Sequence, residues 1–312
     1  MSRMPGLLPL LFFAVSCATG PRTVERPAAK PGDEPSIEGG AAGVAAAAAA
    51  AASAAAAASA AEPRGLSLAW EKNMLSIHGE DIPGGEVEVW YLEAYCRSGS
   101  TNREWAQTVI PHRTEKLEES PDRKRLKLRC EVQGGVEVIH EILAGKDEVD
   151  FRVTATNHGA SRADVVWVQP CLRAGAFTGR EQEDYVEKCF IFIDETLTTL
   201  DKTRREEDAL YRGGQVYVPH GIDRDDVNPR PLSPDEPSNG LIGCFSADGS
   251  RILANAWEPC QELFQGVIVC IHSDFRLGGL EPGEVKTAHG KIYIVPNDPE
   301  KLLERYRKDF PE

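Results

Sequence analysis

Residues 125–142 contain the pattern that decides the fold, and they read RLKLRCEV, then QGG, then VEVIHEI. Apolar and charged residues alternate from Leu126 to Val132, and the second run alternates in the same way. Successive side chains of a strand point to opposite faces, so each run predicts a strand with one face in a core and one in water. The Gly134-Gly135 pair predicts a short turn, which makes the two strands antiparallel neighbours.

The same pattern recurs along the rest of the chain. Apolar residues alternate with charged ones at 86–92, 148–156 and 163–168, and turn-forming residues separate the runs. Further strands are predicted at 189–193, 214–218, 240–246, 251–257, 264–271 and 285–295. An open sheet of that many strands tends to split into two packed layers. We therefore predict an all-β domain over 65–312, a large two-sheet antiparallel sandwich of the supersandwich type.

Helices are predicted at two places only. The clearer one is a short C-terminal helix, in which Asp298 can serve as N-cap and Pro299 fits the first turn. Leu302, Leu303 and Tyr306 then share one face of it. A looser helical segment is predicted at 198–210.

The first 64 residues are predicted to stay outside the core. Residues 1–17 have the layout of a signal peptide, and their end, Ala14-Val15-Ser16-Cys17, resembles a bacterial lipobox with lipidation at Cys17. Ordinary cleavage near Ala18 and an uncleaved anchor are the alternatives. Residues 18–64 are rich in Ala, Gly and Pro and predict a mobile tether. The expectation is an exported protein, periplasmic or at the cell surface, held to the membrane only through a lipid anchor.

Composition excludes several partners and reactions. The net charge is −14 and the basic residues are scattered among acidic ones, so no nucleic-acid partner is predicted. The sequence has no GxSxG, P-loop or GxGxxG motif, which removes support for a serine hydrolase or a nucleotide-binding fold. No cofactor is predicted.

The cysteines and histidines do not predict a metal site. None of the eight cysteines forms a CxxC pair, and the histidines form no HxH or HExxH motif. One or two disulfides are compatible with export, and buried free thiols are the alternative. In the long loop 219–239, oxygen ligands for calcium could come from Asp223, Asp225, Asp226 and Asn228. Their spacing is not that of an EF-hand, and a solvated acidic turn is the other interpretation.

Two stretches resemble the galactose-mutarotase superfamily. Residues 153–157, Val-Thr-Ala-Thr-Asn, are followed by Trp167-Val168-Gln169-Pro170-Cys171-Leu172-Arg173, where that superfamily places a polar cluster on its binding face. Near the C-terminus, Leu-Glu-Pro-Gly-Glu at 280–284 precedes a strand with Tyr293, as in its closing pattern. The resemblance implies a sandwich fold and a sugar ligand. The superfamily's His motif is replaced by Gln169-Pro170-Cys171, and the strand in place of its late glutamate reads Cys270-Ile271-His272-Ser273-Asp274, so epimerase activity does not follow.

Three groups of side chains are candidates for a site. His272 and Asp274 are the predicted acid/base pair, because they share a strand face with Arg276. Trp257 can stack on a sugar ring, and carboxylates and amides beside it can bind hydroxyls. The predicted substrate-binding residues are Trp167, Gln169, Arg173, His220, Arg230, Trp257, Glu258, Gln261, Glu262 and Arg276.

Two functions remain open on these observations. The first is a carbohydrate-associated sandwich that binds or modifies a sugar by cofactor-free acid/base chemistry. The second is a noncatalytic cell-envelope protein that binds a glycan or another protein, or serves as a scaffold. A fold does not specify a function, so the sequence leaves open whether the chain is an enzyme. Convergence of the predicted residues in one place would favour the first.

Overall fold

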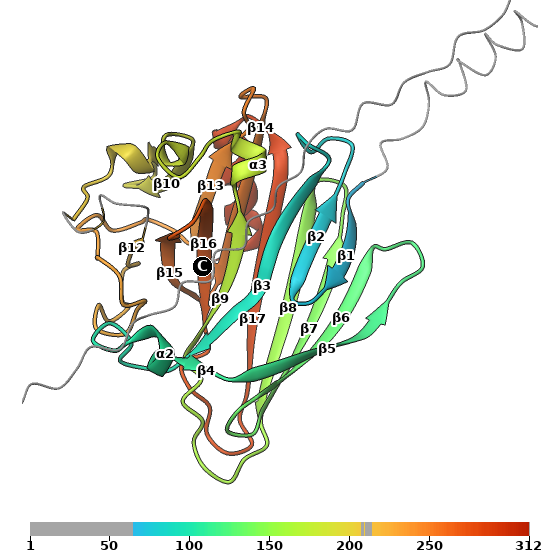
Figure 1. Cartoon of the computed structure of the whole chain (residues 1–312), viewed down its shortest axis with the longest axis vertical. Coiled ribbons are helices and arrows are strands. Elements are labelled where there is room, and N and C mark those ends of the chain that lie inside the picture. Colours follow the sequence, from blue (N-terminus) through green and yellow to red (C-terminus); the bar gives the residue numbers. More distant parts are fainter. Residues whose placement is uncertain (1–64, 207–208, 210–213, 312) are drawn as a thin grey trace, which may run out of the picture. The chain divides into compact units, whose positions relative to one another are not determined.

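Two antiparallel sheets pack face to face in the computed structural model of this chain (Figure 1). The structure describes residues 65–206, 209 and 214–311. The predicted signal peptide, the Cys17 motif and the predicted tether therefore lie outside the described residues. The all-β, two-sheet sandwich predicted from the alternation is confirmed.

The first sheet has eight strands. Its order is β1–β2–β3–β9–β16–β15–β12, and β4 pairs with β3 at one end. The strands are β1 (Ser67–Glu71), β2 (Met74–His78), β3 (Glu86–Cys96), β4 (Val109–Ile110), β9 (Trp167–Arg173), β12 (Gln215–Tyr217), β15 (Cys260–Gln265) and β16 (Cys270–Arg276).

The second sheet has nine strands in the order β11–β10–β13–β14–β17–β8–β7–β6–β5. They are β5 (His112–Glu119), β6 (Arg125–Val132), β7 (Val136–Ala144), β8 (Glu148–Asn157), β10 (Cys189–Ile193), β11 (Thr196–Thr199), β13 (Leu241–Phe245), β14 (Arg251–Glu258) and β17 (Val285–Pro296).

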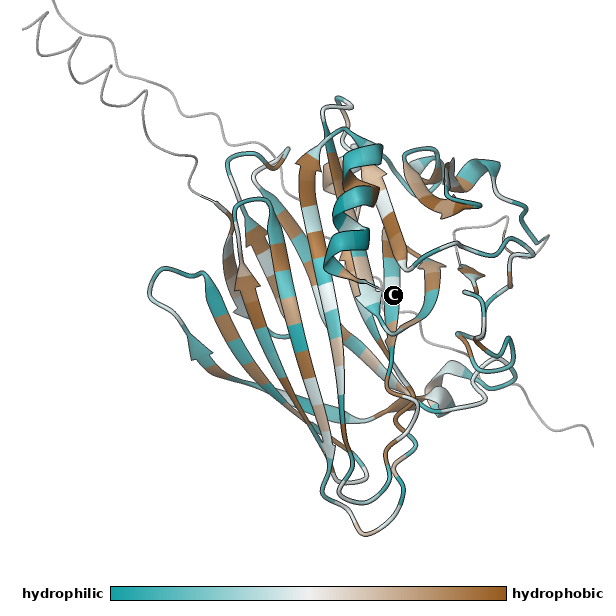
Figure 2. Cartoon of the chain, turned by 180° about the vertical axis from the view of Figure 1, so that it is seen from behind, coloured by the Kyte–Doolittle hydropathy of each residue, from teal (hydrophilic) through white to brown (hydrophobic). Residues whose placement is uncertain are grey.

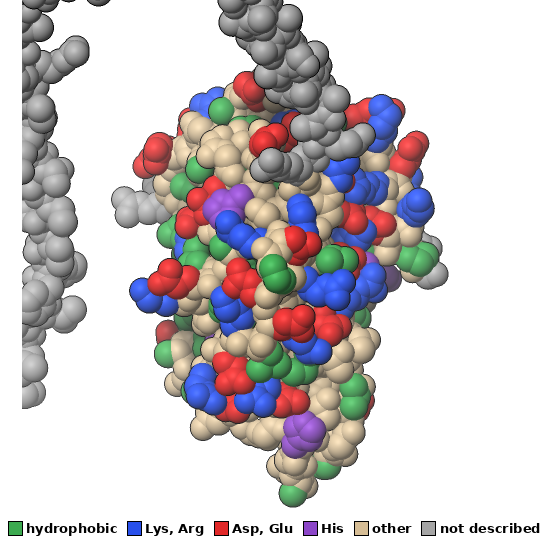
Figure 3. All heavy atoms as spheres, turned by 90° about the vertical axis from the view of Figure 1, so that its right-hand side faces the viewer, with side chains coloured by type: hydrophobic (Ala, Val, Ile, Leu, Met, Phe, Trp, Pro, Cys, Tyr) green, Lys and Arg blue, Asp and Glu red, His purple; other side chains and the backbone are tan. Residues whose placement is uncertain are grey.

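Alternation places one face of each strand in the core, as the hairpin β6–β7 shows. Leu126, Leu128 and Cys130 are buried while the charged residues between them face solvent, and the stripes of Figure 2 follow this pattern. Gly134 and Gly135 both have positive φ, which lets them close the turn. On the solvent side, acidic and basic side chains are interspersed over the face that Figure 3 shows, with pairs such as Arg129–Glu115 at 2.6 Å.

A buried histidine links the two sheets. His140 of β7 bonds through Nδ1 to the Tyr91 hydroxyl and through Nε2 to the Tyr95 hydroxyl, both at 2.9 Å. Both tyrosines lie on β3 of the eight-stranded sheet, and His140 lies on β7 of the nine-stranded sheet. These two hydrogen bonds therefore connect the sheets. Beside it, the ring of Trp257 stacks on Phe275 with centroids 4.4 Å apart. The interior is therefore a packed aromatic and aliphatic core.

The C-terminal helix α4 (Pro299–Asp309) lies against the nine-stranded sheet (Figure 2). The side chain of Asp298 accepts from the Lys301 N–H as N-cap, and Leu302, Leu303 and Tyr306 are buried, as predicted. The other helices are single turns: α2 (Trp105–Thr108), α3 (Gly175–Thr178), η1 (Tyr185–Glu187) and η2 (Leu200–Lys202). Among the described residues, no helix is long and apolar enough to cross a membrane.

Three element predictions were wrong in detail. The strand predicted at 163–168 is irregular over residues 164–166, and β9 begins only at Trp167. The helical segment predicted at 198–210 instead begins as strand β11, where β-branched threonines pair with β10, and continues as the turn η2. The strand predicted at 264–271 contains the turn between β15 and β16, where Val267 and Ile268 are exposed. An apolar turn resembles a strand when only hydropathy is considered.

Candidate functional site

A row of three buried polar side chains crosses the outer face of the eight-stranded sheet. Ile271 and Phe275 of β16 enter the core, so His272 and Asp274, which alternate with them along the strand, face outward. β9 and β15 flank β16, and the antiparallel register sets Asp274 opposite Gln169 on one side and Glu262 on the other. We call Gln169, Asp274 and Glu262 the carboxyl row. Their relative exposures are 3%, 0% and 0%, although they lie on the face away from the other sheet.

The loop 219–239 covers this row, and we call it the cover segment. The backbone N–H of Asn228 donates to Glu262 Oε2 at 2.8 Å, and its side-chain Nδ2 donates to Gln169 Oε1 at 3.2 Å. A second loop holds the cover segment from outside. Ser100 Oγ donates to the Val227 carbonyl at 2.6 Å, and the Gly99 N–H donates to Asp226 Oδ1 at 2.8 Å. The row is thus closed off by residues far from it in sequence.

Several polar atoms around the row have no hydrogen-bond partner among the described residues. They are both carboxyl oxygens of Asp274, Glu262 Oε1, Glu93 Oε2, Asn228 Oδ1 and His272 Nδ1. Buried polar atoms are nearly always paired, because an unpaired one costs about 1–3 kcal/mol. A proton shared between Asp274 and Glu262 can pair two of these oxygens, and the others are open to partners from outside the chain.

Burial also shifts the protonation of these groups. Desolvation raises the pKa of Glu262 to about 8, although the hydrogen bond from the Asn228 N–H acts to lower this pKa. Desolvation, and then the charges of Glu262 and Glu93, raise the pKa of Asp274 well above its ordinary range. Two carboxyls on neighbouring strands do not both ionise easily in a dry environment. At neutral pH the row therefore holds at least one proton that it can give and one oxygen that can accept.

An arginine closes one end of the cluster. Arg276 lies on the same face of β16 as Asp274, and its Nη1 donates to Gln261 Oε1 at 2.6 Å and to Asp226 Oδ2 at 3.1 Å. Gln261 in turn donates to the backbone carbonyl of Asp226. The acidic residue that the sequence offered as a calcium ligand is thus engaged with an arginine and a backbone amide.

The structure brings half of the predicted catalytic and substrate-binding residues together. His272, Asp274, Gln169, Gln261, Glu262 and Arg276 all lie in this cluster. Trp167 lies one row further along the same face, where its Nε1 donates to Ser100 Oγ at 3.2 Å. The predicted acid/base pair is adjacent, with His272 Nδ1 3.8 Å from Asp274 Oδ1.

Other predicted residues lie elsewhere. Trp257 is buried between the sheets against Phe151 and Phe275, so both faces of its ring serve the core. Arg173 lies over the Trp90 ring at 5.7 Å. His220 and Arg230 are exposed, and His220 forms an ion pair with Glu236 at 3.2 Å. Trp257 does not offer a stacking surface for a sugar in this arrangement.

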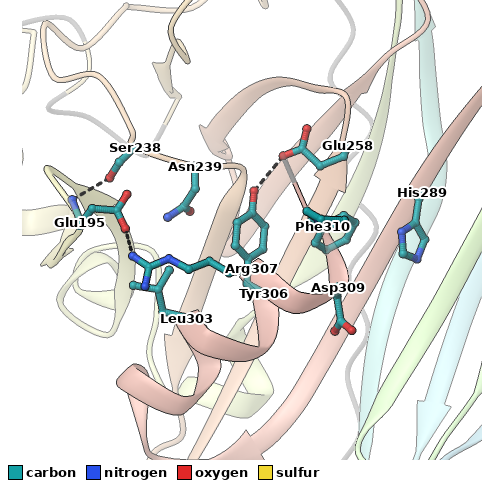
Figure 4. A pocket seen from close by; sticks show the side chains of 11 residues that line it. Glu195, Ser238, Asn239, Glu258, His289, Leu303, Tyr306, Arg307, Asp309 and Phe310 are labelled. Atoms are coloured by element: carbon teal, nitrogen blue, oxygen red, sulfur yellow. Dashed lines mark hydrogen bonds and ion pairs between the residues drawn. The ribbon is translucent and has the colours of Figure 1, made fainter.

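Glu258 belongs to a different cavity, between α4 and the nine-stranded sheet (Figure 4). Its volume is about 620 Å³, and Glu258, His289, Tyr306 and Asp309 are among its lining residues. Figure 4 shows Tyr306 pointing at Glu258, to which its hydroxyl donates at 2.8 Å. His289 pairs with Asp150 at 2.8 Å. These ionisable groups already have partners, in contrast to those of the carboxyl row.

Two members of the cluster were not predicted as site residues. Glu93 follows an irregularity in β3 between Trp90 and Ala94, where Leu92 has positive φ and enters the core. The predicted strand ended at residue 92, and no pattern in the sequence indicates the irregularity. Asn228 lies in a loop whose path depends on contacts with distant residues, and its neighbouring acidic residues suggested only calcium.

Comparison with known proteins gives similar solved structures only. No protein-family model matches the chain, and no curated protein matches it. Solved structures do match. A putative aldose 1-epimerase from Escherichia coli K12 is 10% identical, with 73% of this chain and 98% of that chain covered and a TM-score of 0.40. A galactose mutarotase-like protein from Lactobacillus casei is 11% identical, with 74% and 100% covered and a TM-score of 0.40. A galactose 1-epimerase from Lactobacillus acidophilus is 10% identical, with 75% and 98% covered and a TM-score of 0.32.

Proposed function

We propose that this chain is a carbohydrate-associated sandwich that binds a sugar over the carboxyl row and modifies it by acid/base chemistry. One observation carries the proposal. Asp274 and Glu262 are buried on neighbouring strands with three unpaired oxygens between them, beside the amide of Gln169. Sugar hydroxyls are both donors and acceptors, so they can satisfy carboxyl oxygens and an amide at the same time. Few other small ligands offer such a set of neutral groups.

The row can supply both partners of a proton transfer. Near the Glu262 pKa of about 8, one carboxyl can be protonated while the other is ionised, and the pair can then protonate one oxygen of a sugar and deprotonate another. Opening and closing an aldose ring needs these two transfers, one at the ring oxygen and one at the anomeric hydroxyl. His272 faces Asp274 along the same strand, where it can orient the carboxyl. This chemistry requires that the cover segment move away from Glu262.

The test is anomer exchange in a panel of aldoses, followed by NMR with the full chain. We expect the parent protein to accelerate exchange for at least one sugar. Asp274→Asn should reduce the acceleration by about a hundredfold or more, the usual range for a general acid or base. Glu258→Gln is the matched control, because Glu258 lies in the other cavity, and it should keep the parent rate. An Asp274→Asn variant as active as the parent would exclude the row as the catalytic site.

A noncatalytic role is the second candidate, and the cover segment favours it. Asn228 occupies hydrogen-bonding positions at Glu262 and Gln169 that a ligand would need. A protein that only presents its outer surfaces to a glycan or a protein would not need the row to open. Saccharide binding without any anomer exchange, unchanged in Asp274→Asn, would support this role.

We also propose export with lipidation at Cys17, on the strength of the predicted signal peptide alone. The proposal predicts incorporation of a labelled fatty acid into the chain in a bacterial host. Cys17→Ser should abolish the incorporation, while Cys260→Ser should leave it unchanged. Equal labelling of both variants would refute it.

A further inference from the structure

Two thiols and an imidazole meet beside the carboxyl row. The Sγ atoms of Cys171 and Cys270 and a ring nitrogen of His272 all lie within 4.8 Å of one another. The closest pair is Cys270 Sγ and His272 Nε2, at 3.2 Å. The three residues have relative exposures of 1%, 2% and 1%. A cluster of soft ligand atoms is thus enclosed within the protein.

The strand register builds this cluster. Cys270 and His272 are two residues apart on β16 and therefore share a face. The register that pairs Ile271 with Leu172 places His272 opposite Cys171 on β9. The cluster occupies the row next to the carboxyl row, on the same outer face. It therefore depends on long-range pairing, and no spacing motif could reveal it.

A glycine makes room for the cluster. A Cβ atom at Gly266 would lie 2.2 Å from Cys270 Sγ and 3.0 Å from His272 Nε2. The φ angle of Gly266 is not positive, so space rather than backbone conformation excludes a side chain there. The backbone of the turn between β15 and β16 thus lies directly against the thiol and the imidazole.

The second nitrogen of His272 also suits a metal ligand. His272 Nδ1 and both oxygens of Asp274 lack hydrogen-bond partners among the described residues, and Nδ1 lies 3.8 Å from Asp274 Oδ1. A histidine that binds a metal through Nε2 carries its proton on Nδ1 and donates it, very often to a carboxylate. Asp274 is in the position of that carboxylate.

We propose that Cys171, Cys270 and His272 bind a zinc ion. Zinc takes thiolate and imidazole ligands in tetrahedral geometry, with Zn–S distances of about 2.3 Å, which sets two sulfurs about 3.8 Å apart. The three ligand atoms here lie within 4.8 Å of one another, which is close to the spacing of such a complex. Binding releases one proton from each thiol to solvent, so two thiolates and a neutral imidazole balance the 2+ charge of the ion. A neutral complex is compatible with a buried site, and soft sulfur ligands favour zinc over magnesium or calcium.

The test measures zinc in the full chain, purified under a thiol-free reductant and dialysed against metal-free buffer. We expect about one zinc ion per chain, held by the three protein ligands with a water molecule as the fourth ligand. Cys171→Ser and His272→Gln should each lower the content at least about tenfold. Cys130→Ser is the matched control, because Cys130 is a buried thiol on the nine-stranded sheet, and it should keep the zinc of the parent. Cobalt in place of zinc should give the visible and near-ultraviolet bands of a tetrahedral thiolate complex in the parent and the control only.

A second measurement uses only the parent chain, so it tests the proposal even if the variants fail to fold. In the parent chain, added zinc should raise the thermal unfolding midpoint, and should protect Cys171 and Cys270, but not Cys260, from alkylation. Absence of zinc in the reduced parent, with no change of midpoint on adding zinc, would overturn the proposal. A disulfide between Cys171 and Cys270 in the protein isolated without reductant, re-forming in preference to zinc binding, would also overturn it. Neither outcome would affect the proposed carbohydrate chemistry, whose test is anomer exchange.

Discussion

The backbone N–H of Asn228 donates to Glu262 Oε2 at 2.8 Å, which connects the middle of a long loop to a fully buried carboxyl on strand β15. The same residue reaches Gln169 with its side chain. One loop residue therefore holds two of the three members of the carboxyl row. The position of the cover segment and the accessibility of the row are consequently linked.

Loosening the cover segment from outside should expose the row. Ser100→Ala removes the shorter of two hydrogen bonds to the Val227 carbonyl, which keeps the one from Thr101 Oγ1 at 3.2 Å, and it leaves the buried Trp167 Nε1 without its acceptor. Groups left unpaired in this way cost about 1–3 kcal/mol. We expect faster amide hydrogen exchange in peptides covering residues 222–235. Ser98→Ala is the control, because Ser98 Oγ bonds to Asp164 instead. Equal exchange in parent and Ser100→Ala would show that this contact does not hold the segment.

Replacing the Glu262 carboxyl should stabilise the protein at neutral pH. Its pKa is about 8 in the folded protein and 4.5 ordinarily, so folding holds on to a proton that the unfolded chain releases between these values. The parent is therefore destabilised progressively as the pH rises from 4.5 to 8. Glu262→Gln cannot ionise and keeps an acceptor for the Asn228 N–H.

The measurement is the free energy of unfolding of parent and variant against pH. We expect the two to agree near pH 4 and the variant to be more stable by more than about 1 kcal/mol at pH 7. Glu88→Gln, on the solvent side of β3, is the control and should show no such trend. A Glu262→Gln variant that is less stable than the parent at every pH would mean that the carboxyl stabilises the folded protein, and it would contradict the prediction.

The fold was predictable because alternation is a local signal. Each of the runs at 125–132 and 136–142 encodes its own buried face, and the structure places them as neighbouring strands in the expected register. The site was only partly predictable. His272 and Asp274 share a strand, so their common face follows from spacing alone. Their neighbours Gln169 and Glu262 reach them through pairing between strands that are distant in sequence.

The group 257–262 shows why adjacency in sequence misleads. Trp257 and Glu258 end β14 in the nine-stranded sheet, while Gln261 and Glu262 lie on β15 in the other. The chain crosses between the sheets within these six residues. Trp257 enters the core, Glu258 faces the cavity beside α4, and Gln261 and Glu262 join the cluster. A chain crossover of this kind depends on the whole topology, which hydropathy does not encode.

The inter-sheet histidine predicts a loss of stability in acid. Burial lowers the pKa of His140 to about 3, from 6.5. The folded state thus excludes a proton that the unfolded chain accepts below pH 6.5. The neutral His140 ring contributes fully to the free energy of unfolding above pH 6.5. This contribution is lost as the pH falls toward 3, and the loss is about 3 kcal/mol at pH 4.5.

Comparing His140→Gln with the parent isolates this effect from other titrations. The variant should have the lower stability at pH 7, because the contacts with Tyr91 and Tyr95 are disturbed, but a shallower decline between pH 6.5 and 4.5. His220→Gln, at an exposed position, should follow the parent curve. Parallel curves for the parent and His140→Gln would contradict the assignment.

Calorimetric titration of the full chain with a panel of mono- and oligosaccharides tests the central claim most directly. The central claim is that the carboxyl row binds a sugar. We therefore predict saturable binding of at least one saccharide, weakened at least about tenfold in Glu262→Gln, a loss of about 1.4 kcal/mol or more, and unchanged in Glu258→Gln. Binding that Glu262→Gln leaves intact, or no binding across the panel, would contradict the account.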